Sequence, residues 1–321
     1  MNHHNNLKST SNRSLFRILG LFFLVASYSF LAYKLITYKQ YHELVAELSQ
    51  FTVSRYSWLV VVFLLLPINW LIESLKWKLM TVHVQTISLK TSVKSVLAGI
   101  TTGFFTPNRV GDLVGRVMYL DTENRKSGVT LSLLSSLTQN MVMTLCGLPA
   151  CILFFATTKT NNSATIYYPL YVLICLILIG LIYFFLPQIS SLFNKSRFSD
   201  RIKEFTDCLS NYSPKELLQI ISVALFRYMV FCVQFYFMLK FFGIELSVLQ
   251  ALIAIPTSYL FVTFTPSFAF SDAAVRSSIA VLVIGVFSPK VIGIALAGMC
   301  IWLINFVMPM LVGSVLIVRK R

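Results

Sequence analysis

Long apolar segments recur along this chain of 321 residues and limit its fold more than any other feature. A helix needs about 20 predominantly apolar residues to cross the hydrocarbon core of a bilayer. Six windows are long enough: 15–37, 57–75, 128–157, 166–187, 215–240 and 290–317. Hydrophobic residues make up 56% of the chain and charged residues only 12%, too few to cover a water-soluble globule. The sequence therefore predicts an all-α, polytopic helical membrane bundle.

Two shorter apolar windows, 90–106 and 246–264, run into similar polar turns. In each, an aromatic residue precedes a Thr-Pro pair, and an Asp and an Arg follow with a spacing of four: Thr106-Pro107 with Asp112 and Arg116, and Thr265-Pro266 with Asp272 and Arg276. Proline lacks the backbone N–H, and it pushes the preceding residue out of the helical region. We therefore expect a helix to end near each threonine, with the Asp at the N-cap or in the first turn of the next helix. The spacing of four places Asp and Arg on one helix face.

The basic residues favour one orientation of this bundle. With the N-terminus in the cytoplasm, the cytoplasmic segments hold nineteen Lys and Arg and the external segments hold seven, while Arg227 lies inside a span. Because cytoplasmic loops are enriched in Lys and Arg, we expect both termini to be cytoplasmic. The first broken helix then starts from the cytoplasmic side and the second from outside. Short, proline-interrupted helices in opposite orientation indicate a transport site. The prediction is about six full spans plus two re-entrant helical hairpins in an inverted repeat.

The predicted organisation is a single integral membrane domain, 1–321. Its parts are a cytoplasmic tail (1–14), a first half (15–187), a cytoplasmic linker (188–214) and a second half (215–321).

Motifs for catalysis, cofactors or metals do not occur in the sequence. The six cysteines form no CxxC pair, the four histidines form no HExxH, and there is no GxSxG, Walker A or dinucleotide-binding pattern. We therefore expect no enzyme activity, no cofactor and no metal. In a soluble protein the formal net charge of +15 would suggest nucleic acid, but no basic domain lies outside the apolar segments. Anionic lipid headgroups are the expected partners instead.

Polar side chains inside the predicted spans are candidates for a binding site. Arg227 lies near the middle of its span, where an Arg costs about 2.5–3.5 kcal/mol on insertion scales. Amide side chains occur within two other spans. Together with the residues of the two turns, the candidate substrate-binding residues are Arg109, Asp112, Arg116, Gln139, Asn140, Arg227, Asp272, Arg276 and Asn305.

Most of these candidates also have a purely structural interpretation. Each Asp–Arg pair could cap and stabilise its turn, and amides commonly connect membrane helices. Glu73 lies three residues before Lys76, so a local ion pair explains it. As a set, however, cations and amides suit an anion with an apolar body, since Arg binds phosphate through paired hydrogen bonds.

The segment Pro107-Asn108-Arg109-Val110-Gly111-Asp112 resembles a signature of the membrane domain of lysylphosphatidylglycerol synthases and their stand-alone flippase-like relatives. That signature is Pro-x-Arg-hydrophobic-Gly-acid, followed by a basic residue. Here the acid is Asp where Glu is usual, Arg116 comes one position later, and the second turn lacks the family's glycines. The resemblance implies a lipid-translocating or lipid-handling protein of a bacterial or archaeal cell inner membrane. We expect the synthase chemistry to be absent, because the chain ends at Arg321 after its last span.

The leading hypothesis is a lipid flippase-like membrane transporter that handles an anionic phospholipid or lipid-linked headgroup in a polar intramembrane cavity. A second hypothesis is a non-transporting membrane subunit that supports a cell-envelope glycosyltransferase or lipid-modifying enzyme. A third is a membrane-embedded enzyme acting on a lipid-linked substrate. The possible protein partners are further copies of this chain, forming a homo-oligomer, or such an envelope enzyme.

Overall fold

The computed structural model describes residues 53–106, 109–158, 168–195, 207–266 and 269–318, and in these ranges the chain is helical with no strands. The elements in chain order are α3 (Val53–Met80), α4 (Leu89–Phe104), α5 (Gly111–Val117), the 3-10 turn η2 (Thr122–Asn124), α6 (Arg125–Thr158), α7 (Tyr168–Phe184), α8 (Leu186–Lys195), α10 (Pro214–Phe241), α11 (Val248–Phe264), α12 (Ala269–Ile284), α13 (Val291–Trp302), the π-helical turn η4 (Leu303–Val307) and α14 (Met308–Val318).

Four helical stretches are long and apolar enough to cross a membrane, namely Arg55–Met80, Thr122–Thr158, Pro214–Phe241 and Val291–Val318. They correspond to four of the six predicted spans. The predicted span 166–187 is represented by a shorter apolar helix, Leu170–Phe184. The window 15–37 and the tail 1–14 lie outside the described residues. In the predicted linker, residues up to Lys195 continue as the helix α8.

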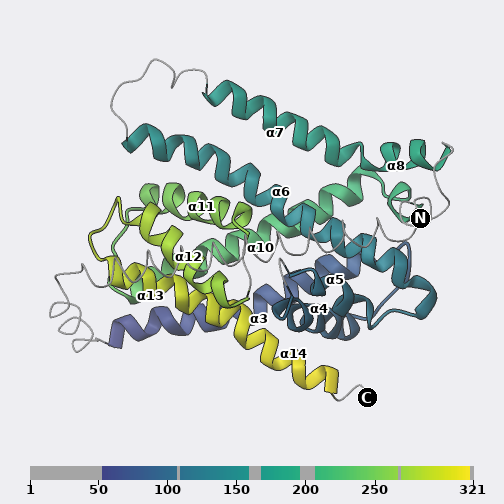
Figure 1. The fold of residues 1–321 in the computed structure, drawn as a ribbon, viewed down its shortest axis with the longest axis horizontal. Helices are drawn as coiled ribbons and strands as arrows, with labels where there is room; N and C mark the ends of the chain where they lie inside the picture. The colour runs from purple at the N-terminus through teal and green to yellow at the C-terminus, as the bar shows by residue number, and fades with distance from the viewer. Residues whose placement is uncertain (1–52, 107–108, 159–167, 196–206, 267–268, 319–321) are drawn as a thin grey trace, which may run out of the picture.

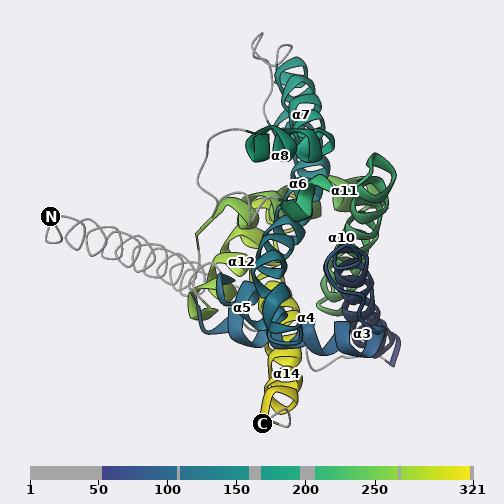
Figure 2. The same cartoon turned by 90° about the vertical axis from the view of Figure 1, so that its right-hand side faces the viewer.

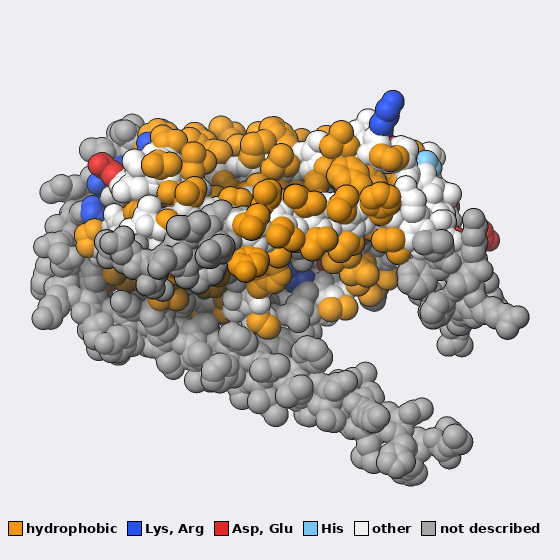
Figure 3. Space-filling view, turned by 90° about the horizontal axis from the view of Figure 1, so that it is seen from above, with side chains coloured by type: hydrophobic (Ala, Val, Ile, Leu, Met, Phe, Trp, Pro, Cys, Tyr) orange, Lys and Arg blue, Asp and Glu red, His pale blue; other side chains and the backbone are white. Residues whose placement is uncertain are grey.

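The outer surface of the bundle carries apolar side chains where a bilayer would contact it. α7 lies beside α6 at the edge of the bundle, and leucine and isoleucine side chains are exposed around much of its circumference (Figure 2). Viewed over α7 and α6, hydrophobic side chains cover the middle of the molecule and charged ones lie mainly toward its two ends (Figure 3). A helix that is hydrophobic all round is typical of a lipid-facing position.

Two clusters of buried apolar side chains hold the helices together. One includes Tyr228, Phe235, Tyr259 and Ile284, from α10, α11 and α12. The other includes Trp77, Met80, Leu131 and Leu217, from α3, α6 and the start of α10. α10 begins with a capping box in which the Ser213 hydroxyl and the Glu216 carboxylate each accept a hydrogen bond from the other's backbone N–H.

The two interrupted helices end where the sequence predicts. α4 ends at Phe104 and α11 at Phe264, each just before its Thr-Pro pair. Asp112 and Asp272 lie in the first turns of the helices that follow. The short pair α4–α5 lies toward one end of the long helices, and α11–α12 lies toward the other (Figure 1). The bundle thus contains two broken elements that approach its middle from opposite ends.

Glycines allow α5 to pack directly on α4. A Cβ at Gly111 would overlap the carbonyl oxygen of Thr102, and one at Gly115 would overlap the Thr102 hydroxyl and lie 2.5 Å from the Ala98 carbonyl oxygen. The Thr102 hydroxyl donates a hydrogen bond to the carbonyl oxygen of Gly111, at 2.7 Å. Small residues four apart let membrane helices approach this closely. This packing brings Asp112 and Arg116 into the middle of the bundle.

Candidate functional site

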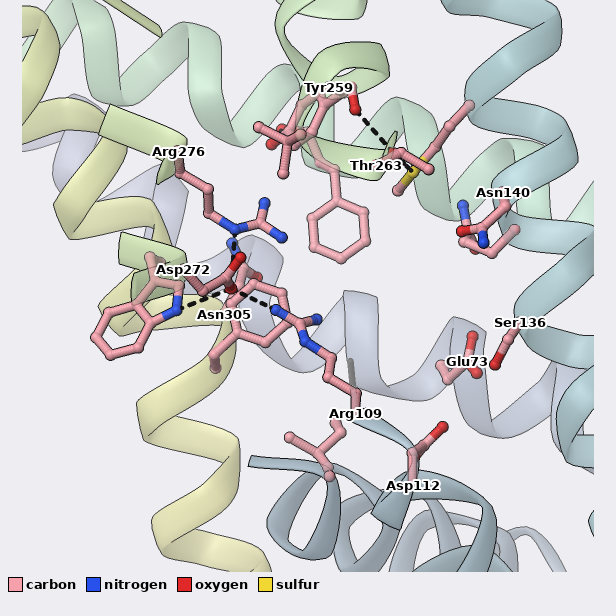
Figure 4. A pocket seen from close by; sticks show the side chains of 18 of the residues that line it. Glu73, Arg109, Asp112, Ser136, Asn140, Tyr259, Thr263, Asp272, Arg276 and Asn305 are labelled. Atoms are coloured by element: carbon pink, nitrogen blue, oxygen red, sulfur yellow. Dashed lines mark hydrogen bonds and ion pairs between the residues drawn. The ribbon is translucent and has the colours of Figure 1, made fainter. Parts of the chain in front are cut away.

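A polar cavity of about 550 Å³ lies between the two broken elements. Every one of the nine predicted site residues lines it, although they come from five separate elements and the turn before α5. They are Arg109, Asp112, Arg116, Gln139, Asn140, Arg227, Asp272, Arg276 and Asn305. The structure therefore brings the whole candidate set together. Figure 4 shows the positions of Arg109, Asp112, Asn140, Asp272, Arg276 and Asn305 around the cavity.

Asp272 is the centre of one cluster of contacts in this cavity (Figure 4). Its Oδ2 atom accepts hydrogen bonds from Arg109 Nη2 at 2.6 Å, from Trp302 Nε1 at 3.0 Å and from Arg276 Nε at 3.1 Å. The Arg276 contact is the predicted pair at a spacing of four. The Arg109 contact crosses from the turn before α5 to α12, so it joins the two broken elements.

Arg109 adopts an unusual backbone conformation, with φ at +59°. Few residues other than glycine adopt this left-handed conformation, and strain of this kind clusters at functional sites. Its guanidinium lies 3.6 Å from the centre of the Phe306 ring, and the guanidinium of Arg276 lies 4.8 Å from the same ring. Phe306 therefore holds two cations near each other through cation–π contacts.

Glu73 is the centre of a second cluster. Its carboxylate lies 2.6 Å from Arg116 Nη1, 2.8 Å from Lys76 Nζ and 2.8 Å from Arg227 Nη1. The predicted local pair with Lys76 is present, but Glu73 also joins α3 to α5 and α10. Glu73 is 1% exposed, so this ion-pair network is buried. A buried charge needs such partners, because desolvating it alone is costly.

Two further contacts orient Arg227. Its Nε donates to Oδ1 of Asn69 at 2.9 Å, and its Nη1 donates to Oε1 of Gln139 at 3.4 Å. The side chain of Gln139 also donates to the carbonyl oxygen of Ala224, at 3.5 Å. Gln139 thus connects α6 to α10 and faces the cavity as well, so it fits both of its predicted interpretations.

The other two amides differ from Gln139. Asn140 is exposed to the cavity. Asn305 is 7% exposed, and within the described ranges its Nδ2 has no hydrogen-bond partner. It lies on the π-helical turn η4, and such turns occur frequently at functional sites. A buried donor without a partner carries a desolvation cost that a bound acceptor would offset.

Positive charge exceeds negative charge in this cavity. Five cationic side chains and three carboxylates line it. The cations are Lys76, Arg109, Arg116, Arg227 and Arg276, and the carboxylates are Glu73, Asp112 and Asp272. In the part of the chain described here, the terminal nitrogens of Arg276 donate no hydrogen bond to a protein group. The cavity can therefore accept an anion without first losing all of its ion pairs.

Some cavity residues were not predicted as site residues. They are Glu73, Lys76, Trp302 and Phe306, which have no recognisable spacing relative to the two turns. Only the packing of α3, α13 and η4 brings them close to the cavity. Glu73 had one usable signal, since a carboxylate within an apolar span is itself unusual. Among the described residues, no group of three or more His, Cys, Asp or Glu could hold a metal ion.

Comparison with known proteins identifies a family for this chain. No significant match was found among curated proteins or solved structures. The family described as Lysylphosphatidylglycerol synthase TM region matches residues 17–317, which is nearly the whole chain. The Pro107–Asp112 motif and this match agree, and the chain belongs to the Lysylphosphatidylglycerol synthase TM region family.

Proposed function

We propose that this chain is a flippase-like transporter that moves an anionic phospholipid or lipid-linked headgroup across a cell inner membrane through the polar cavity. The single observation that carries the proposal is the cavity's excess of positive charge between two broken elements that approach from opposite ends. Interrupted helices at membrane depth are tolerated only within protein or beside a water-filled cavity. In transporters such helices surround the substrate site.

The chemistry of the cavity favours a phosphate group. Arg276 and Arg109 lie beside the same Phe306 ring, and the terminal nitrogens of Arg276 are available to an anion. Guanidinium groups bind phosphate through two parallel hydrogen bonds. The buried Nδ2 of Asn305 supplies a further donor. In this proposal, no covalent chemistry takes place in the cavity.

The pair Arg109–Asp272 gives the proposed transporter a way to change state. The bond joins the turn before α5 to α12. A phosphate that binds Arg109 competes with Asp272 for the same guanidinium, so substrate binding weakens the connection between the two broken elements. We propose that these elements are re-entrant hairpins in an inverted repeat, and that they open alternately to the two sides.

The distribution of basic residues supports an orientation with both termini in the cytoplasm. The last turn of α3 contains Lys78, α6 begins at Arg125, and Lys215 follows the first residue of α10. These three helix ends lie toward the same end of the molecule as α4, α5 and the end of α14 (Figure 1). Basic residues are enriched on the cytoplasmic side.

The test is headgroup exposure in proteoliposomes that contain a fluorescent phosphatidylglycerol. Arg276→Gln should slow transbilayer movement by about tenfold, the factor that one lost charge-assisted hydrogen bond supplies. Lys215→Gln removes an exposed charge outside the cavity and should leave the rate unchanged. Equal rates in all three proteins, or no movement above empty liposomes, would overturn the proposal. No movement together with stable co-purification of an envelope enzyme would favour the non-transporting subunit.

A further inference from the structure

A second pocket, of about 370 Å³, adjoins the polar cavity. α6, α11, α12 and the turn after α11 form it. Its lining residues are Phe154, Phe261, Phe264, Thr265, Ile279, Leu282 and Val283. Phe264 and Thr265 also line the polar cavity, so the two spaces meet at the end of α11.

This apolar pocket offers nothing to a polar ligand. Six of its seven lining residues are hydrocarbon or aromatic. The exception is Thr265, whose hydroxyl already donates to the carbonyl oxygen of Phe261 at 2.7 Å. A polar group placed here would lose its water and gain no partner, at a cost of about 1–3 kcal/mol by protein mutational data. The apolar lining of this pocket therefore favours a hydrocarbon ligand.

The surroundings indicate where that hydrocarbon comes from. Phe264 is 67% exposed and Leu282 is 57% exposed, and both lie at the boundary of the pocket. Neighbouring apolar side chains, such as Leu153 on α6 and Val286 in the turn after α12, are also exposed. In a membrane-spanning chain these side chains contact acyl chains. One side of the pocket is limited by the Phe154 ring, which packs edge-to-face on Phe287 at 6.0 Å.

The size of the pocket distinguishes an acyl chain from a protein helix. A volume of about 370 Å³ lies near the lower end of small-molecule sites, which span roughly 300–1,000 Å³. A helix with its side chains is about 10–12 Å in diameter and would need a longer and wider groove.

We propose that the pocket formed by α6, α11 and α12 holds one acyl chain of the lipid whose anionic headgroup occupies the polar cavity. This proposal rests on the proposed function and extends it by giving the lipid a path. The headgroup lies beside Arg276 and Arg109, the chain passes Phe264, and the tail lies between α6 and α12. The ring of Phe264 separates the charged part of the lipid from its hydrocarbon part. Lipid therefore reaches the cavity sideways, from the bilayer.

The experiment uses the full chain in phosphatidylcholine vesicles with two photoreactive probes. Phosphatidylglycerol and phosphatidylcholine carry the same diazirine on one acyl chain, and mass spectrometry maps the crosslinked residues. We expect crosslinks at Ile279, Leu282 and Val283 to favour phosphatidylglycerol by about tenfold, as one charge-assisted headgroup bond predicts. Arg276→Gln should abolish the preference. Val286 lies in the turn after α12, is 53% exposed and should react equally with both probes.

A second variant pair tests occupancy of the pocket. Ile279→Phe fills the pocket and should reduce the phosphatidylglycerol crosslinks at Leu282 and Val283, whereas Val286→Phe should not. If Ile279→Phe does not fold, Leu282→Phe replaces it, with the crosslink read at Val283. Equal labelling of the pocket by both probes, or no effect of filling it, would overturn the acyl-chain site.

The two proposals fail in distinguishable ways. Headgroup-dependent labelling of the pocket without transbilayer movement would leave the acyl-chain site standing and remove the transport function. Transbilayer movement with equal labelling by the two probes would support the transport function and overturn the acyl-chain site.

Discussion

Arg109 and Asp272 are 163 positions apart in the chain, and their side chains meet at 2.6 Å. This ion pair joins the two broken elements, and it depends on both Thr-Pro interruptions. The first places Arg109 in a left-handed turn, and the second places Asp272 at the start of α12. The same Asp272 oxygen also accepts from Trp302 and Arg276. One carboxylate therefore coordinates the turn before α5, α12 and the end of α13.

Asp272→Asn should destabilise the protein by about 1–3 kcal/mol, less than the loss of a partner from a fully buried ion pair, because the Arg109 side chain is 44% exposed. The neutral amide leaves Arg109 and Arg276 without a compensating charge. The measurement is the free energy of unfolding in detergent. Asp207→Asn, at an exposed residue, is the matched control and should change stability by less than about 0.5 kcal/mol. Similar stabilities of the two variants would contradict this role of Asp272.

Glu73→Gln should have a larger effect, about 3–5 kcal/mol, because three buried cations lose their shared carboxylate. The same substitution at the exposed Glu123 should be nearly neutral. Thermal unfolding of the two variants under identical conditions checks the prediction. A loss of stability below about 1 kcal/mol, the value of a single exposed pair, would contradict the buried network around Glu73.

Gly115→Ala should destabilise the packing of α5 on α4 by about 1–3 kcal/mol, since the new methyl group overlaps Ala98 and Thr102. Gly180→Ala is the matched control on α7, where an added Cβ would have no atom within 4 Å. There the higher helix propensity of alanine should stabilise by up to about 1 kcal/mol. The two substitutions should thus have opposite signs in thermal unfolding, and equal signs would refute the close contact.

Stability should fall at alkaline pH through Cys208, which precedes α10. Burial raises the pKa of its thiol from 9.0 to about 11. A pKa that is higher in the folded state contributes stability below pH 9 and loses it as pH rises toward 11. Cys208→Ala should flatten the decline of the unfolding temperature between pH 9 and 11. Cys175→Ala, at an exposed position on α7, should follow the wild-type curve. An unchanged slope in Cys208→Ala would contradict the assignment.

Local sequence patterns predicted much of the candidate site. Proline and the residue before it determine where α4 and α11 end, and the spacing of four brings Asp112 to Arg116 and Asp272 to Arg276. These are effects within one or two helical turns, and the structure confirms both the helix ends and the Asp–Arg pairs. The apolar window 166–187 predicted a helix but not where it ends, because length and hydropathy do not show that this helix stops at Phe184.

The sequence by itself determined that the chain is an apolar helical bundle with two broken elements and a set of polar side chains that need a buried environment. Helix length, proline geometry and the cost of charge in hydrocarbon act locally, so they can be read from neighbouring residues. Only the tertiary structure decided which charges share a partner. Glu73 with Arg227, and Arg109 with Asp272, come from different helices, and their pairing depends on how glycine contacts and apolar clusters pack those helices together.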